Sequence, residues 1–283
     1  MKIAVGKERV NSLFIDNNNI YVARKAEIEI YDKGTNSLKH TISVGEKGVQ
    51  ICIDENYIYC TSNHNFIVYN KQSYELLHKK QFGYDISSDL RRPVNDKNNV
   101  YFPIRNGEII AINKHDFNSF STLKMHPQTV WGMCVDENYL YTGCVDTVVR
   151  KIAKQSFKPV FELKLHKKNV QRLAVNENCL FSTGSDFDIV ITNKHTGKEL
   201  NRLKKVHNKA VNGLFIHNNY LISSCQAQGL IKVFSLATFN TVNELNYSVD
   251  EGGGIVFDSN KVYIALKKEK CILVMDNKQL FNE

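Results

Sequence analysis

One pattern recurs along the whole chain: an apolar run, a short polar turn and a second apolar run. Clear copies lie at residues 10–23, 49–61, 130–143, 170–184 and 211–224, and weaker copies at 90–102 and 253–265. One polar residue marks each turn, at intervals of 38 to 41 residues: Asp16, Asp54, Asn95, Asp136, Asn176, His217 and Asp258. A strand-built repeat of this length is typical of a β-propeller, in which each repeat forms one blade.

Each repeat carries four strand signals. In the fourth, apolar runs at 131–135, 139–142 and 148–152 precede residues 160–165, which alternate apolar and polar like a half-exposed outer strand. We therefore predict one all-β domain over residues 1–283, a seven-bladed β-propeller of four-stranded blades. The predicted blades span residues 8–45, 46–84, 85–126, 127–166, 167–207, 208–247, and 248–283 together with 1–5.

The first residues predict how the ring closes. KIAVGKERV (2–10) resembles TISVGEKGV (41–49), which links the outer strand of the first blade to the second blade. The last repeat has no full outer strand after residues 271–275. Residues 1–5 should therefore supply that strand and complete the seventh blade, which removes an open sheet edge.

Composition argues against several classes of protein. No run of 18 apolar residues is present, so no membrane insertion is expected, and the first residues do not resemble a signal peptide. Seven cysteines are scattered without a CxxC pair, which favours free thiols, a cytoplasmic location and no metal centre. No nucleotide-binding or hydrolase motif occurs, so no cofactor is expected.

The repeats resemble the WD40 family. His126, His166 and His207 each stand four residues before the valine that opens an inner strand. Thr142-Gly143 and Thr183-Gly184 match the Ser-Gly of that family, and Asp146 and Asp186 match its loop aspartate. The family's Trp-Asp ending survives only in degenerate forms: Tyr31-Asp32, Tyr69-Asn70, Phe234-Ser235 and Met275-Asp276.

The resemblance implies a hydrogen-bonded tetrad within a blade. It assigns His126, Thr142 and Asp146 to blade four, and His166, Thr183 and Asp186 to blade five. A Thr–His–Asp set could also serve as nucleophile, base and orienting group. We expect the structural role, because satisfying buried polar groups is the common fate of such residues.

Positive charge is concentrated in one part of the chain. Residues 150–209 hold fourteen Lys and Arg against five Asp and Glu, whereas the whole chain has a net charge of +8. Two clusters, at 164–168 and 204–209, fall in loops expected on one rim; they include Lys167, Lys168, Lys205 and Lys209. Such a rim could attract an acidic protein, a phosphorylated ligand or nucleic acid, or it could be a solvated surface.

The mouth of the central channel is a second candidate binding surface. By the resemblance, the position after the start of each inner strand faces this mouth: Asn11, Gln50, Arg91, Trp131, Gln171, Asn212 and Gly254. Trp131 is the chain's one tryptophan and should neighbour Arg91, a composition found at interface hot spots. The alternative is that Trp131 packs into blade four.

We expect a non-catalytic scaffold that binds a partner protein on this face. The alternatives are a basic rim for nucleic acid or a phosphorylated ligand, and a lyase or hydrolase acting in the channel. The channel enzyme is disfavoured because the predicted ring of mouth residues contains no histidine or carboxylate.

Overall fold

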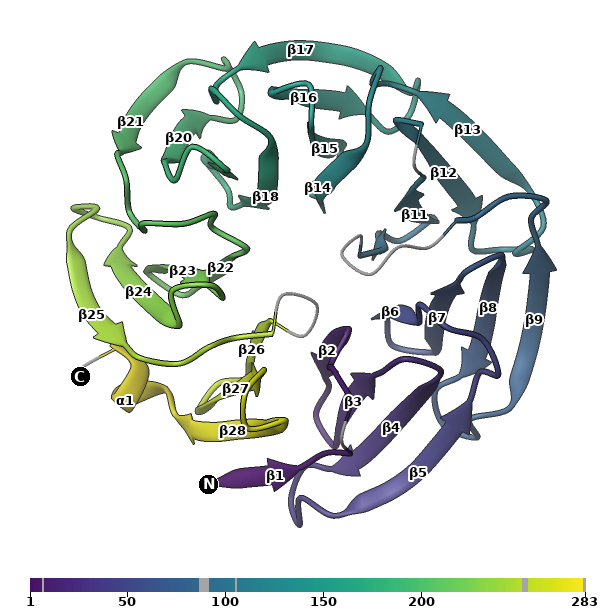
Figure 1. Cartoon of the computed structure of the whole chain (residues 1–283). Helices are drawn as coiled ribbons and strands as arrows, with labels where there is room; N and C mark the ends of the chain where they lie inside the picture. The colour runs from purple at the N-terminus through teal and green to yellow at the C-terminus, as the bar shows by residue number, and fades with distance from the viewer. Residues whose placement is uncertain (7, 87–91, 105, 251–253, 282–283) are drawn as a thin grey trace.

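The computed structural model describes residues 1–6, 8–86, 92–104, 106–250 and 254–281. These residues form seven four-stranded antiparallel sheets, arranged as blades around a central axis (Figure 1). The predicted all-β, seven-bladed propeller is therefore confirmed. Within each blade the strands are called A to D from the axis outward.

Blades one to three follow chain order from the axis outward. Their strands are β2 (Ser12–Ile15), β3 (Asn19–Ala23), β4 (Glu27–Asp32) and β5 (Leu38–Ser43); β6 (Gln50–Ile53), β7 (Tyr57–Ser62), β8 (Asn65–Asn70) and β9 (Leu76–Gln81); and β10 (Val94–Asn95), β11 (Asn99–Pro103), β12 (Glu108–Asn113) and β13 (Phe120–Lys124).

Blades four to six repeat this order. Their strands are β14 (Val130–Val135), β15 (Tyr139–Cys144), β16 (Val148–Ala153) and β17 (Lys158–Lys164); β18 (Val170–Val175), β19 (Cys179–Gly184), β20 (Ile189–Asn193) and β21 (Glu199–Leu203); and β22 (Gly213–His217), β23 (Tyr220–Cys225), β24 (Leu230–Ser235) and β25 (Thr241–Leu245).

Blade seven joins the two ends of the chain. Its inner strands are β26 (Ile255–Phe257), β27 (Lys261–Leu266) and β28 (Cys271–Asp276), and its outer strand is β1 (Lys2–Ala4). Strand β1 pairs antiparallel with β28, Lys2 opposite Leu273 and Ala4 opposite Cys271. This pairing confirms the predicted closure, and Figure 1 shows the N-terminus beside β28.

A short helix, α1 (Asn277–Phe281), follows β28 and packs against blade six, where the side-chain amide of Asn243 donates to the carbonyl of Leu280 at 2.8 Å. Over the described ranges, no helix has the length and apolar character needed to cross a bilayer.

The apolar core lies between the blades rather than in one central mass. Each of seven buried clusters draws its residues from two neighbouring blades. In blade one, Tyr21 and Ile30 face blade two, whereas Ile20 and Val22 face blade seven. Successive side chains of a strand point to opposite faces, so both faces of a blade must be apolar.

A repeated polar unit fixes the turn between strands A and B. In blade one, Asp16 Oδ1 accepts from the amides of Asn18 and Asn19, and its Oδ2 accepts from the Tyr21 hydroxyl at 2.8 Å. In blade three the equivalent residue is Asp96, which accepts from Tyr101 at 3.0 Å. The expected turn residue Asn95 is therefore wrong by one position, because Asn95 lies in β10 and its amide donates to Ile53.

Five lysines extend these units from blade to blade, each ammonium contacting the turn aspartate of the preceding blade. The pairs are Lys33–Asp258 at 2.8 Å, Lys71–Asp16 at 3.3 Å, Lys114–Asp54 at 2.5 Å, Lys154–Asp96 at 2.7 Å and Lys194–Asp136 at 3.0 Å. Burial raises the pKa of Asp258, but the Lys33 ammonium and two backbone amides outweigh burial and hold the pKa at about 2.

These turns lie on the lower face, which we define by the A–B and C–D turns. The upper face is formed by the D–A loops, which connect successive blades, and by the B–C loops.

Candidate functional site

The basic clusters lie on the upper face of blade five. Lys164, Lys167 and Lys168 stand in or beside the loop that enters this blade, and Lys204, Lys205 and Lys209 follow its outer strand β21; all six are exposed. The strong charge of the sequence segment thus becomes a surface feature on two neighbouring loops.

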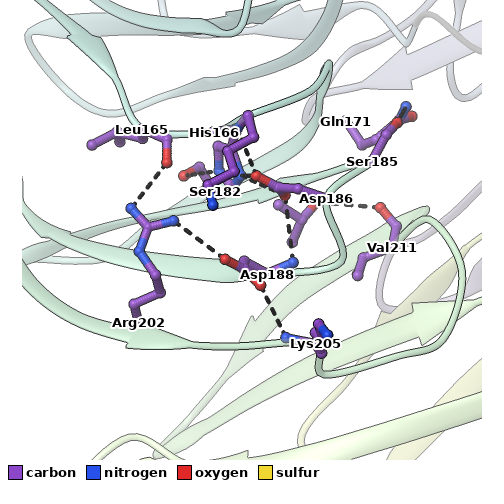
Figure 2. A network of polar contacts seen from close by, with 12 residues as sticks. Leu165, His166, Gln171, Ser182, Ser185, Asp186, Asp188, Arg202, Lys205 and Val211 are labelled. Atoms are coloured by element: carbon purple, nitrogen blue, oxygen red, sulfur yellow. Dashed lines mark hydrogen bonds and ion pairs between the residues drawn. The ribbon is translucent and has the colours of Figure 1, made fainter.

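Two aspartates of the intervening B–C loop fix both loops. Asp186 Oδ2 accepts from the Lys167 amide at 2.8 Å, and Asp188 Oδ1 accepts from the Lys205 amide at 2.9 Å. Arg202 reinforces this arrangement, since its guanidinium lies 3.4 Å from Asp188 Oδ2 and donates to the Leu165 carbonyl at 2.9 Å (Figure 2). These carboxylates hold backbone in place and contact no lysine ammonium among the described atoms.

A depression of about 880 Å³ lies between the two loops. Lys164, Lys167, Lys204 and Lys205 line it, together with Arg202, Asp186 and Asp188. Within the described part of the chain, none of the four lysine ammonium groups forms an ion pair. We call these four lysines the blade-five rim.

The basic run is not one continuous patch. Arg150 binds Asp146 at 2.8 Å and Glu162 at 2.9 Å inside blade four. Lys154 and Lys194 belong to the blade-to-blade pairs of the lower face. Lys151 is buried and donates to the Lys194 carbonyl at 2.7 Å, with its ammonium 3.8 Å from the ring centroid of Tyr139. A charge count along the sequence therefore overstates the cations available to a partner.

Three of the predicted mouth residues are buried, so the exposure expected for them is wrong. Asn11, Gln50 and Gln171 are 6%, 0% and 4% exposed. The Asn11 amide donates to the carbonyls of Arg24 and Val49, and so joins blades one and two. Gln171 donates to the Ser185 hydroxyl at 2.7 Å (Figure 2). Asn11 thus satisfies backbone groups of two blades, and Gln171 satisfies a hydroxyl of its own blade.

The other mouth positions differ from one another. Trp131 and Asn212 are half-buried, and Arg91 lies outside the described residues. Trp131 falls where the pairing of β14 with β15 shifts register between Val130 and Gly132. Such a bulge redirects a side chain away from the sheet pattern. Gly254 is buried with φ +72, a conformation that favours glycine.

Two arginines near the axis were missed by the sequence analysis. A Cβ on Gly254 would come within 2.8 Å of the Arg92 guanidinium, so this glycine leaves the space that the arginine fills. Burial, aided by the charge of Arg172, lowers the pKa of Arg92 to about 9. Arg172 donates to the Gln171 carbonyl at 2.7 Å. The dipeptide 91–92 was the available signal, but only its first residue was assigned to the mouth.

The tetrad contacts form in blade four. His126 Nε2 lies 2.7 Å from Thr142 Oγ1, and its Nδ1 lies 3.3 Å from Asp146 Oδ2. Arg150 also contacts His126 Nδ1, so that a guanidinium bridges the imidazole and the carboxylate. Burial, together with this neighbouring charge, lowers the pKa of His126 to about 4.

In blade five the hydroxyl partner is Ser182, and the assignment to Thr183 is wrong. His166 Nε2 lies 2.8 Å from Ser182 Oγ, and Nδ1 lies 3.0 Å from Asp186 Oδ1. Because the carboxylate can only accept, Nδ1 donates to Asp186. Thr183 points to the other face of β19 and donates to the Val211 carbonyl at 3.2 Å. Val211 is labelled in Figure 2.

Blade six contains a third set that the sequence analysis did not assign. His207 Nε2 lies 2.8 Å from Ser223 Oγ, and Nδ1 lies 3.3 Å from Gln228 Oε1. In all three blades the hydroxyl stands sixteen residues after the histidine. This constant separation is the signal that identifies Ser182 and Ser223.

These sets are poorly placed for chemistry on a substrate. The side chains of His126 and His166 are 0% exposed, and Thr142 and Ser182 are 0% exposed as whole residues. His126, Cys144 and Asp146 place ligand atoms within 4.8 Å of one another. Arg150 already supplies a cation to two of these three groups, and burial raises the pKa of the Cys144 thiol to about 12, so the residues fit a metal ion poorly.

Comparison with known proteins gives the architecture alone. The chain matches no family model and no curated protein. Among solved structures it is similar to the computationally designed Ika8 protein, with a TM-score of 0.73 and 15% sequence identity over 96% of this chain and 97% of the other. At this identity the similarity shows a shared β-propeller fold and carries no information on function.

Proposed function

We propose that this chain is a non-catalytic, WD40-like interaction scaffold that holds an acidic partner protein on the upper face of blades four to six. The blade-five rim is the observation that carries the proposal. Four exposed lysines surround a depression of about 880 Å³, while the nearby aspartates are used to fix the loop backbone. An excess of cations on firmly held loops attracts and orients an acidic surface.

Two further features support the proposal. Trp131 is half-buried at a bulge of β14, in the blade next to the rim, and could supply the apolar centre of an interface. The His–hydroxyl contacts of blades four to six agree with a WD40-like repeat, and their burial favours a structural role over catalysis.

The test is affinity capture from the source cell with three forms of the chain. The first is the wild type, and the second carries Lys167→Glu and Lys205→Glu in the rim. The third is a matched control, Lys97→Glu, in which an exposed lysine of a lower-face turn is reversed. The proposal predicts an acidic protein that is retained by the wild type and the control and lost from the rim variant.

Treatment of the lysate separates the alternative ligands. Loss of the bound material after nuclease digestion would assign the rim to nucleic acid, and loss after phosphatase treatment would assign it to a phosphorylated ligand. Equal retention by all three forms would contradict a role for the rim.

A further inference from the structure

A second depression lies on the upper face where the first and last blades meet. Its volume is about 580 Å³, and Val10 and Leu266 form part of its apolar lining. Figure 1 places this junction across the ring from blade four. The depression is therefore separate from the blade-five rim and independent of the function proposed above.

A buried carboxylate fixes one wall. The side chain of Asp250 is 3% exposed; its Oδ1 accepts from Arg9 Nε at 2.9 Å, and its Oδ2 accepts from the Val10 amide at 3.1 Å. The Arg9 side chain is 37% exposed and lines the depression. The carboxylate thus orients an arginine and the loop that enters blade one.

Four lysines from three loops complete the lining: Lys25, Lys47, Lys267 and Lys270. Lys25 lies 3.7 Å from Glu8, both about half-exposed, and Lys267 donates to the Gln226 amide oxygen at 3.0 Å. Lys47 and Lys270 are exposed and form no ion pair within the described ranges. Among the described residues, the lining therefore holds five cations, Arg9 and the four lysines, against two carboxylates, Glu8 and Asp250.

We propose that this depression binds a small organic phosphate, a phosphate ester of metabolite size. The phosphate lies among the ammonium groups of Lys25, Lys47 and Lys270, and the organic part packs on the lysine stems, above the floor that the buried Val10 and Leu266 form. Cations that approach from three loops suit a phosphate, whose oxygens accept from several directions. The volume is within the range of about 300–1,000 Å³ that is common for small-molecule sites.

Such a ligand would join loops of blades seven and one, next to the place where the short β1–β28 pairing closes the ring. Binding to the folded state should therefore raise the melting temperature.

The experiment uses three probes on the full chain: phenyl phosphate, inorganic phosphate and phenol. Titration calorimetry and thermal unfolding are measured for the wild type, for Lys47→Gln/Lys270→Gln and for the control Lys97→Gln. We expect phenyl phosphate to bind at least about tenfold more tightly than inorganic phosphate, and phenol not to bind, because the site needs both parts of the ligand.

The double variant should lose at least about tenfold in affinity for phenyl phosphate, whereas the control should match the wild type. Both substituted lysines are exposed, so the variants should fold, and circular dichroism checks this. The proposal would be overturned if the wild type did not bind phenyl phosphate. It would also be overturned if the double variant bound it as tightly as the control. The rim variant Lys167→Glu/Lys205→Glu should bind phenyl phosphate normally, which separates this site from the proposed partner surface.

Discussion

Histidines at equivalent positions in blades four, five and six meet different partners. His166 faces an aspartate, His207 faces Gln228, and His126 shares its aspartate with Arg150. The shared contact is with a buried hydroxyl, 2.7 to 2.8 Å from Nε2. The contact between the histidine and the hydroxyl, rather than the contact with an aspartate, is therefore what the three blades share.

The hydroxyl contact can be tested with two isosteric substitutions in blade four. Thr142→Val should lower the free energy of unfolding by about 1–3 kcal/mol, because it leaves a buried ring nitrogen without a partner. Thr147→Val is the control, since the Thr147 hydroxyl is buried with no hydrogen-bond partner in the described structure. The control should be neutral or slightly stabilising in urea unfolding, and equal losses would contradict the account.

The lowered histidine pKa values predict an acid-sensitive fold. Burial lowers the pKa of His126 and of His207 to about 4, below the ordinary value of about 6.5. The unfolded chain then binds these protons first, so stability is complete above pH 6.5 and falls as the pH drops toward 4. Each histidine should lower the free energy of unfolding by about 1.4 kcal/mol for every pH unit that the pH falls within that window.

Urea unfolding at pH 7.5, 6.0 and 5.0 measures this effect. His207→Gln removes one of the two groups. The free energy of unfolding should therefore fall by about 1.4 kcal/mol less between pH 6.0 and 5.0 than it does in the wild type. An unchanged slope in this variant would show that His207 titrates normally in the folded state.

At the scale of elements, the A–B turn varies in a correlated way. Blades with a turn aspartate have tyrosine five residues later and are followed by a blade with the pairing lysine, as in Asp136, Tyr141 and Lys194. In blade five the corresponding residues are Asn176, Phe181 and Leu236. Loss of the acid thus accompanies loss of both its partners, which indicates that the three side chains act as a unit.

A double-mutant cycle tests this unit. Lys194→Leu alone should destabilise by about 1–3 kcal/mol, because it leaves the partly buried Asp136 without its cation. Adding Asp136→Asn recreates part of the natural arrangement of blade five and should recover part of the loss, giving a coupling of at least about 0.5 kcal/mol. If the losses of unfolding free energy from the two single substitutions added up to the loss in the double variant, the ion pair would contribute nothing to stability.

The sequence predicted most elements because each strand is buried on two faces and leaves a dense apolar signal. The predictions that were wrong concern single residues. Thr183 was matched through the following glycine, although a shift of one residue places a side chain on the other face of β19. Asn11, Gln50 and Gln171 looked like surface residues because a buried amide side chain cannot be distinguished, in sequence, from one that faces solvent.

At the scale of the whole molecule, closure depends on a three-residue strand. Deleting residues 1–5 removes β1 and the buried side chains of Ile3 and Val5. The loss of this burial alone should cost about 3–6 kcal/mol, which a thermal melt would report as a large drop in melting temperature. A synthetic peptide of residues 1–8 should restore part of the stability, and an unchanged melt would contradict the closure.

The distribution of charge over the ring divides the upper face into distinct regions. Cations of the basic segment that enter the core or the lower-face pairs cannot reach a partner, so long-range attraction should come from the blade-five rim. Trp131, closer to the axis, should contribute to the lifetime of a complex instead. The two parts are therefore expected to affect different rate constants.

The most direct measurement is the association rate, by stopped-flow fluorescence at several salt concentrations, of the acidic partner that the capture experiment is expected to identify. Lys167→Glu/Lys205→Glu should lower the association rate by at least about tenfold at low salt and flatten its salt dependence, with little change in dissociation. Trp131→Ala should mainly raise the dissociation rate. An association rate that is the same for the wild type and the rim variant at every salt concentration would contradict the account.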